Sequence, residues 1–282
     1  MNARVISGRE VAEKILSNDL RSRVEKLKDK NIVPKLVVIL VGEVKASASY
    51  VAQKEKFAGK AGIESEVRRF EDSISEQEIL SEVNQINSDS SIHGVIVQLP
   101  LPKHISVTKV LNSIDPSKDV DGFTPSNVGK LFLGEDTLVS CTPKGIMSIL
   151  QSADIDLTGK NVTVIGRSNI VGKPVSILCQ QQNATVTMCH SKTRDLNAKL
   201  ADADVIIVAA GVPKFINGDQ IPDGAVVVDV GIHNIDGKLC GDVDFESASK
   251  KASAITPVPG GVGPMTVCAL IENTILAAER TL

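Results

Sequence analysis

Hydrophobic and polar positions along this chain alternate in segments that predict strands and helices in turn. Unbroken apolar runs at 35–42 (KLVVILVG) and 94–102 (GVIVQLPLP) predict strands that are covered on both faces, as in a parallel sheet. A shorter strand is expected near 65–70. Amphipathic segments predict helices at 7–28, 47–61 and 75–88. Alternation of strands and helices is typical of right-handed βαβ units, so the first half of the chain is expected to be α/β.

The second half repeats this alternation after a glycine-containing turn. Residues 161–179 (NVTVIGRSNIVGKPVSILC) read as a strand, a turn and a helix, with Gly166 and Gly172 in the turn and Ser168 where a further glycine could stand. Four buried strands are expected to follow, at 184–189, 204–211, 224–231 and 254–263. Regularly spaced strands after a glycine turn predict a Rossmann-type nucleotide-binding domain.

A polar segment with glycine and proline at 124–134 marks the expected boundary between two domains. A helix from 141 follows it, with Thr142 as N-cap and Pro143 at its first position. We therefore expect an N-terminal α/β substrate domain at 1–139 and a Rossmann-type domain at 140–264, with a cleft between them. The last helix, 265–282, is expected to pack back on the first domain.

Composition narrows the class of protein. The chain has 282 residues, 42% hydrophobic content and a net charge of −3, which suits two domains with cores of their own and gives no nucleic-acid footprint. Its five cysteines form no C-x-x-C pair, so a zinc site is not expected. The same cysteine pattern predicts a protein of a reducing compartment. The N-terminus lacks a signal-peptide core and no stretch is long enough to span a bilayer. A cytoplasmic protein without a bound metal or membrane partner is expected.

One lysine lies on the apolar face of the predicted helix at 47–61. At 100° per residue, Tyr50, Lys54 and Phe57 share a stripe, whereas Lys56 and Lys60 lie on the polar side. A buried lysine needs a partner, or desolvation lowers its pKa and makes it a base near neutral pH. The alternative is a Lys54 side chain that reaches out of a packed face to solvent.

Two further candidates lie where chain segments leave the first sheet. Gln98 stands at the carboxyl end of a buried strand, where ligands of α/β proteins bind, although it could simply cap backbone groups. The loop at 115–123 (DPSKDVDGF) holds three carboxylates. It could cap a helix or point one Asp into the cleft, and it lacks the ligand spacing of a calcium loop.

The cofactor preference can be predicted from the end of the second strand of the Rossmann-type domain. NAD sites usually carry an acidic residue there for the ribose hydroxyls. Here the chain reads HSKTR at 190–194, and Arg167 in the glycine turn adds another cation. Hydroxyls and cations suit a 2′-phosphate and favour NADP, although a solvated basic turn would look the same.

Two other classes of protein share some of these sequence features. Tyr50 and Lys54 have the Tyr-x-x-x-Lys spacing of short-chain dehydrogenases, but there the glycine turn comes first and the Tyr/Lys helix follows within one domain. The order here is reversed and spans two domains, which indicates substrate on the first domain and nucleotide on the second. A non-catalytic Rossmann redox sensor remains the alternative, although it has no need of a buried lysine near a glutamine and a carboxylate.

The motifs together resemble the bifunctional methylenetetrahydrofolate dehydrogenase/methenyltetrahydrofolate cyclohydrolase family over essentially the whole chain. The matching segments, in family order, are VGEVKASASYVAQKEK, GVIVQLPLPKHI, DPSKDVDGF, CTPKGIM, GRSNIVGKP, HSKT, DVGI and TPVPGGVGPMT. The resemblance implies oxidation of methylenetetrahydrofolate by NADP⁺ through hydride transfer, followed by hydrolysis of the methenyl bridge to 10-formyltetrahydrofolate. It leaves a dehydrogenase without the second activity as an alternative, and it implies a homodimer.

The resemblance also implies roles for individual residues. Lys54 would be the catalytic lysine of hydrolysis, Gln98 would orient it, Asp121 would hold the pterin ring and Tyr50 would lie against the folate. Pro259, Gly260 and Gly261 would form a wall beside the folate, although these residues also suit a plain turn. On the cofactor side the implied contacts are Gly166, Arg167 and Ser168 to the phosphates, Ser191 to the 2′-phosphate and Ile232 beside the nicotinamide.

Overall fold

The computed structural model describes residues 3–42 and 45–282, and the side chains of all of these except 45–51. The chain forms two compact units. Unit 1 contains residues 1–12 and 142–266, and unit 2 contains residues 13–141 and 267–282. Each unit is therefore built from two separate stretches of chain. The cleft expected between the two domains stays a prediction.

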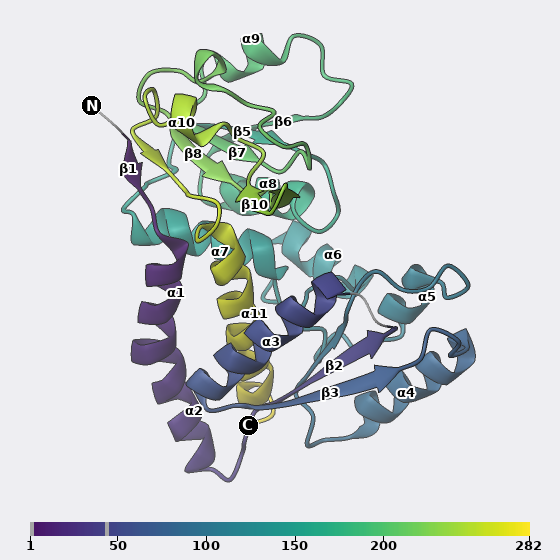
Figure 1. The fold of residues 1–282 in the computed structure, drawn as a ribbon. Coiled ribbons are helices and arrows are strands. Elements are labelled where there is room, and N and C mark those ends of the chain that lie inside the picture. The colour runs from purple at the N-terminus through teal and green to yellow at the C-terminus, as the bar shows by residue number, and fades with distance from the viewer. Residues whose placement is uncertain (1–2, 43–44) are drawn as a thin grey trace. The chain divides into compact units, whose positions relative to one another are not determined.

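Unit 1 is built on a six-stranded sheet in the order β1-β11-β8-β7-β5-β6, in which every pair is parallel (Figure 1). The strands are β1 (Arg4–Val5), β5 (Asn161–Ile165), β6 (Thr185–Cys189), β7 (Val205–Val208), β8 (Val226–Asp229) and β11 (Ala254–Ile255). The chain moves from β5 to β6 on one side and then to β7 on the other, so its direction of winding reverses between β5 and β7. Ligands of such sheets bind at the carboxyl ends of the strands at this reversal.

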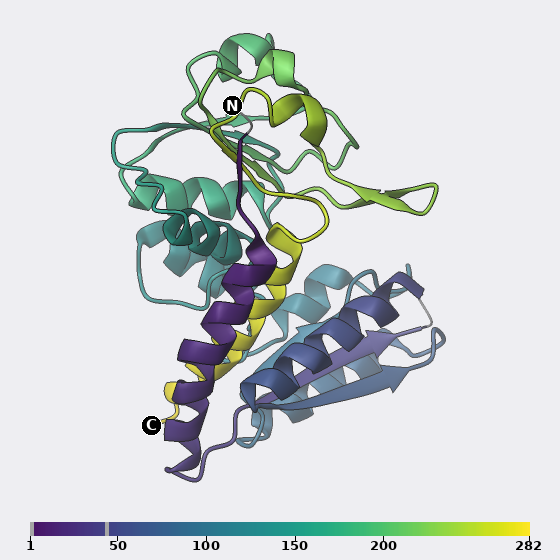
Figure 2. The same ribbon diagram turned by 60° about the vertical axis from the view of Figure 1, so that its left-hand side comes forward.

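The helices and turns of unit 1 connect these strands. They are α7 (Cys141–Ser152), α8 (Gly172–Gln181), α9 (Leu196–Leu200), the 3₁₀ turn η2 (Gly218–Gln220) and α10 (Phe245–Ala248). One core of buried apolar residues joins β5, β7, β8 and β11 to α9 and α10, with Ile206, Val227 and Ile255 fully buried. The strands β9 (His233–Ile235) and β10 (Lys238–Cys240) form an antiparallel hairpin that extends away from the sheet (Figure 2).

Unit 2 is built on a three-stranded parallel sheet in the order β3-β2-β4. The strands are β2 (Lys35–Val41), β3 (Glu64–Phe70) and β4 (Gly94–Val97). Six of the seven residues of β2 are buried, as the unbroken apolar run predicted. The segment 118–120 continues the sheet beside β4, where Val95 N donates to Lys118 O at 2.9 Å and Val95 bridges to Asp119.

Helices cover both faces of this small sheet. Val37 and Ile39 of β2 pack with α4 (Glu76–Ser88) and α5 (Val107–Asn112) in one apolar cluster. The helix α3 (Lys45–Ala61) covers the other face (Figures 1 and 2). A capping box at Ser75 starts α4, because the Ser75 side chain accepts from Glu78 N and Glu78 accepts from Ser75 N.

Four helices complete the chain. They are α1 (Gly8–Ile15), α2 (Arg21–Lys28), α6 (Pro125–Leu133) and α11 (Val262–Glu279). A five-residue π-helix, η1 (Leu16–Leu20), joins α1 to α2, so the helix expected over 7–28 is continuous but changes its winding. Within unit 2, Arg23 of α2 makes a bidentate ion pair with Glu279 at the end of α11, at 2.7 and 2.8 Å.

The sequence-based expectation for the last strand was wrong. The expected strand at 254–263 covers only Ala254–Ile255, because Pro257 and Pro259 cannot donate to a strand ladder. The polar segment at 124–134 contains α6, with Thr124 as N-cap, Pro125 at its start and Gly134 in the left-handed region at its end.

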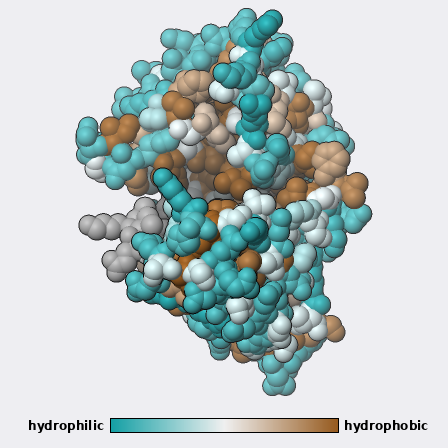
Figure 3. All heavy atoms as spheres, turned by 90° about the vertical axis from the view of Figure 1, so that its right-hand side faces the viewer, coloured by the Kyte–Doolittle hydropathy of each residue, from teal (hydrophilic) through white to brown (hydrophobic). Residues whose placement is uncertain are grey.

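Hydrophilic side chains cover much of the face shown in Figure 3, and hydrophobic ones form scattered groups on it. Within the described residues, no helix has the length and apolar character needed to cross a membrane.

Candidate functional site

Lys54 and Gln98 meet at the carboxyl end of the three-stranded sheet of unit 2. Lys54 lies on α3, which follows β2, and Gln98 directly follows β4. The winding of this sheet reverses between β2 and β4, so the two residues lie at the position where α/β sheets bind ligands. Lys54 Nζ donates a hydrogen bond to Gln98 Oε1 at 2.9 Å, and both side chains are half-buried. The contact expected between the two residues is therefore present.

Gln98 is itself held by two further hydrogen bonds. Its backbone N–H donates to Ile39 O of β2 at 2.9 Å, and its side-chain Nε2 donates to Leu99 O at 3.0 Å. Because Nε2 is used in this way, the amide oxygen is directed to the lysine. The arrangement fixes a neutral acceptor, rather than a carboxylate, beside the Lys54 amine.

Asp121 lies in the same region, in the turn after the strand-like segment 118–120. Burial raises the pKa of Asp121 above its ordinary value, and the negative charge of Asp119 adds to this effect. The positive charge of Lys54 and a hydrogen bond with Cys141 act in the opposite direction and lower this pKa. The site therefore combines a lysine amine, a carboxyl group and an oriented amide at one end of the sheet.

The loop that carries Asp121 is held from below by a buried polar network. Asp119 is 1% exposed, and its carboxylate accepts from Thr124 N at 2.7 Å and from Asn127 Nδ2 at 2.9 Å. Asn127 in turn accepts from the Thr137 hydroxyl at 2.8 Å. Of the carboxylates in this loop, Asp119 serves the loop itself, and Asp121 is the one directed to the site.

In unit 1 the glycine turn has the shape of a phosphate cradle. Gly166 has φ of 130°, and a side chain there would collide with Ala209 O after β7, at the reversal between β5 and β7. A side chain at Gly172 would collide with Gly166 O. The turn leads into α8, a helix of ten residues whose first turn presents free backbone N–H groups. Ser168 shapes the turn, because its Oγ accepts from Val171 N at 3.1 Å.

The residues expected around the rest of the cofactor are on loops at the same edge of the sheet. Arg167 and Ser168 are exposed in the turn after β5, and Ser191 is exposed after β6. His190 orders the loop that contains Ser191. Its ring Nδ1 accepts from Lys192 N at 3.1 Å, and its backbone N–H donates to Thr193 Oγ1 at 2.8 Å. An exposed cation and a hydroxyl thus follow neighbouring strands, as a 2′-phosphate site requires.

Ile232 lies after β8, on a loop held by buried carboxylates that the sequence did not single out. Asp229 accepts from Gly231 N, Asp242 N and Val243 N at 2.9–3.0 Å, and burial raises its pKa to about 6 against these hydrogen bonds. Asp242 is fully buried and accepts from Gly211 N at 2.8 Å. Its other oxygen lies 2.7 Å from His233 Nε2. Ile232 itself is 45% exposed.

The Pro259–Gly261 segment follows β11 in unit 1. Gly260 has φ of 101°, and its carbonyl accepts from Arg9 N at 3.0 Å. Gly261 packs so closely on Gly8 that a side chain at Gly8 would collide with the Gly261 carbonyl. Backbone at both glycines approaches its neighbours at a distance that only glycine allows. Tyr50 is the one expected site residue whose side chain lies outside the described residues.

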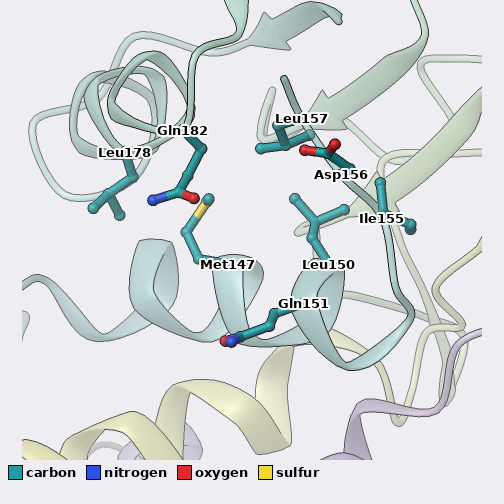
Figure 4. Close-up of a pocket in the computed structure, with 8 residues that line it drawn as sticks. All are labelled: Met147, Leu150, Gln151, Ile155, Asp156, Leu157, Leu178 and Gln182. Atoms are coloured by element: carbon teal, nitrogen blue, oxygen red, sulfur yellow. The ribbon is translucent and has the colours of Figure 1, made fainter. Parts of the chain in front are cut away.

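A separate hollow of about 350 Å³ lies on unit 1 between α7 and α8 (Figure 4). Met147 and Leu150 of α7 point into it from one side, and Leu178 and Gln182 at the carboxyl end of α8 point into it from the other. The glycine turn precedes the opposite end of α8, so this hollow lies apart from the turn. Within the described residues, no three His, Cys, Asp or Glu side chains are grouped to hold a metal ion.

Comparison with known families decides the class of protein. Residues 6–121 match the model of the tetrahydrofolate dehydrogenase/cyclohydrolase catalytic domain, and residues 140–282 match that of the NAD(P)-binding domain of the same family. The chain belongs to the tetrahydrofolate dehydrogenase/cyclohydrolase family. This confirms the family resemblance and the two-domain α/β fold predicted from the sequence. It also confirms the predicted class, a folate-dependent dehydrogenase/cyclohydrolase, and the predicted nicotinamide dinucleotide cofactor.

Individual members of this family are similar over their whole length. The bifunctional protein FolD of Bacillus subtilis is 52% identical over 283 residues, with 100% of each chain covered. The FolD structure from Campylobacter jejuni is 47% identical with a TM-score of 0.97, and covers 99% of this chain and 100% of its own. The FolD structure from Trypanosoma brucei, complexed with NADP and an inhibitor, is 37% identical with a TM-score of 0.94, covering 100% and 99%.

Sequence reasoning missed residues that surround Asp121 rather than line the site. One of them is Cys141, whose Sγ donates to Val120 O at 3.2 Å. Asn273 is fully buried on α11, and its side chain also reaches Val120 O. The signal for Asn273 was present, because it is an amide within the otherwise apolar sequence CALIENTILAA.

Proposed function

We propose that this member of the family catalyses both reactions of its class with NADP as cofactor. It oxidises 5,10-methylenetetrahydrofolate to the 5,10-methenyl form, and then hydrolyses that product to 10-formyltetrahydrofolate. The observation that carries the proposal is the hydrogen bond from Lys54 to the oriented amide of Gln98, near Asp121, at the ligand-binding edge of unit 2. A redox sensor without chemistry would have no use for this arrangement.

For hydride transfer, we propose that the protein supplies binding and orientation. The nicotinamide of the bound cofactor supplies a hydride acceptor, and the folate nitrogen stabilises the cation left behind. Asp121 would hold the pterin ring by accepting from its N–H groups, while Tyr50 would lie against the folate. Pro259, Gly260 and Gly261 would form a wall beside it. Alignment of the two carbons is then the main contribution of the protein.

For hydrolysis, we propose that Lys54 manages the protons. Water adds to the bridging carbon, one carbon–nitrogen bond breaks, the released nitrogen keeps one proton and a second proton leaves. Lys54 would take a proton from the attacking water, and Gln98 would keep the lysine amine directed at the bridge. The neutral amide suits this task, since a carboxylate at its position would hold the lysine in its charged form.

For the cofactor, we propose that the glycine cradle binds the phosphates of NADP. Gly166 and Ser168 would contact the pyrophosphate, because their turn leads into the start of α8, where backbone N–H groups favour an anion. Arg167 and Ser191 would bind the 2′-phosphate, and Ile232 would touch the nicotinamide. The exposure of Arg167, Ser191 and Ile232 supports these assignments.

The test of the catalytic assignment is Lys54→Met, with NADPH and methenyltetrahydrofolate followed separately in the presence of methylenetetrahydrofolate and NADP⁺. We expect NADPH formation to continue while methenyltetrahydrofolate accumulates, because loss of a general base costs about 10²–10⁴-fold in the hydrolytic step. Lys56→Met, an exposed lysine on the same helix, is the matched control. Normal hydrolysis by Lys54→Met would remove the lysine from the mechanism. A wild-type protein that accumulates methenyltetrahydrofolate would be a dehydrogenase only.

We further propose a homodimer. The edge strand β6 supports it, since the sheet of unit 1 ends there and Met188 on that strand is 37% exposed. Pairing of two such edges is a common way to cover an exposed strand. Light scattering should give about twice the chain mass of 29.9 kDa, and Met188→Lys should shift it to the monomer. A monomeric wild type would refute the dimer, and an unaffected dimer would refute this interface.

A cytoplasmic location, and use of the formyl product in purine biosynthesis, complete the proposal. Both rest on the family resemblance alone. Fractionation of cells and the purine requirement of a deletion strain are the corresponding tests.

A further inference from the structure

A buried amide on the last helix holds the backbone on both sides of the proposed folate-binding carboxylate. Asn273 of α11 is 0% exposed. Its Nδ2 donates to Val120 O at 2.8 Å and to Val139 O at 2.7 Å. Both hydrogens of one NH₂ group are thus used to join two segments that are distant from α11 in sequence.

The Val120 carbonyl belongs to the peptide that leads directly into Asp121. It receives a second donor, since Cys141 Sγ donates to it at 3.2 Å. Rotation of this peptide would turn the Asp121 side chain, and two donors on one carbonyl oppose that rotation. The orientation of the carboxylate is therefore linked to the amide of Asn273.

The residue after Asp121 is held by the other segment that Asn273 contacts. Gly122 has φ of 68°, and a side chain on it would lie within 2.8 Å of Val139 C, Leu138 O and Ser140 N. The turn at Asp121 thus packs closely against 138–140, the stretch whose Val139 carbonyl accepts from Asn273 Nδ2. Loss of Asn273 would loosen the turn on both sides at once.

We propose that Asn273 is a positioning residue for folate binding, acting through the orientation of Asp121. This inference rests on the proposed function, in which Asp121 holds the pterin ring. A carboxylate that binds two ring N–H groups must point directly at them. A displacement of about 1 Å can lower the reaction rate about a hundredfold. Asn273 itself touches neither substrate nor cofactor in this scheme.

The experiment is a double-mutant cycle between Asn273→Ala and Asp121→Ala, read as KM for methylenetetrahydrofolate and KM for NADP⁺. We expect Asn273→Ala to raise the folate KM at least tenfold, and to leave the KM for NADP⁺ unchanged, because the cofactor residues are in unit 1. In the Asp121→Ala background the same substitution should add little, since its route of action is gone. Thr274→Val is the matched control: it removes a buried hydroxyl that donates to Leu270 O within α11, at 2.9 Å.

The outcomes separate this inference from the proposed function. An equal folate effect of Asn273→Ala with and without Asp121 would show a general structural role and overturn the inference, as would an unchanged folate KM. If Asp121→Ala alone leaves the folate KM unchanged, the assignment of Asp121 in the proposed function fails instead. Should Asn273→Ala not fold, Asn273→Ser keeps one donor, and the same cycle with it decides the question.

Discussion

The neutral amide of Gln98 can be tested by changing only its charge. Gln98→Glu keeps the size and shape of the side chain but places a carboxylate where Oε1 now accepts from Lys54 Nζ at 2.9 Å. Two unit charges about 4 Å apart attract by about 4 kcal/mol at an effective dielectric of 20. Both side chains are half-buried, so screening by solvent reduces this to about 2 kcal/mol, or about thirtyfold.

This attraction favours the ammonium form of Lys54 and so withdraws the base from the hydrolytic step. We expect the cyclohydrolase rate of Gln98→Glu to fall by about thirtyfold or more at neutral pH, and to recover as the pH is raised. The dehydrogenase rate should change far less, because hydride transfer uses no protein base. The assay is hydrolysis of added methenyltetrahydrofolate across pH, with NADPH formation measured on the same samples.

A neutral variant separates charge from hydrogen bonding. Gln98→Met removes the acceptor and adds no charge, so it should weaken hydrolysis without the recovery at high pH. If Gln98→Glu hydrolyses methenyltetrahydrofolate at the wild-type rate, or if its pH profile coincides with that of Gln98→Met, then Lys54 is not the base and the reasoning is wrong.

Two further predictions concern unit 1. Arg167→Ala should reduce the preference for NADP⁺ over NAD⁺, measured as the ratio of kcat/KM values, by about tenfold or more, because a hydrogen bond to a charged group contributes about 1.5–3 kcal/mol. Lys251→Ala, at an exposed lysine of the same unit, is the control. An unchanged ratio in Arg167→Ala would remove Arg167 from the phosphate site. For Asp229, the pKa raised to about 6 in the folded chain means that its contribution to stability is full below about pH 4 and is lost as the pH rises through 6. Urea unfolding should therefore show the wild type losing about 3 kcal/mol relative to Asp229→Asn between pH 4 and 7, and parallel profiles would contradict this.

The regular part of the fold could be predicted from the chain because burial leaves a clear pattern. The strand at 35–42 reads as apolar throughout and is buried on both faces as β2. The helix at 75–88 carries its capping box in the sequence. The glycine turn after β5 is also visible, since Gly166 and Gly172 stand where a side chain would collide with backbone. In each case one local property decides the structure.

The parts that could not be predicted depend on partners far away in the sequence. The strand β1 has two residues, both exposed, and exists because it pairs with β11 some 250 positions later. The hairpin β9–β10 turns at Asp236 and Gly237, both at positive φ, in a stretch with no long alternating pattern. A two-residue strand or a short hairpin carries too little periodic signal to be read from sequence.

The same distinction holds for the site. Lys54 and Gln98 were identifiable because a lysine on an apolar face and a glutamine at a strand end each break a local pattern. The residues that hold the site in shape, Asp242 and Asn273, have partners that only the folded chain reveals. Apart from His233 beside Asp242, the partners described here are backbone atoms, which no side-chain motif records.

Each of the two units is built from two stretches of chain, and this limits when each unit can fold during synthesis. Residues 1–12 precede all of unit 2 in the chain but belong to the unit completed by 142–266, and residues 267–282 follow all of unit 1 but belong to unit 2. Each unit can therefore be completed only after part of the other unit has been synthesised. A protein cut between residues 141 and 142 would leave both fragments without a stretch of their own unit. The two units are separate in architecture, yet neither can be produced whole by a single cut in the chain.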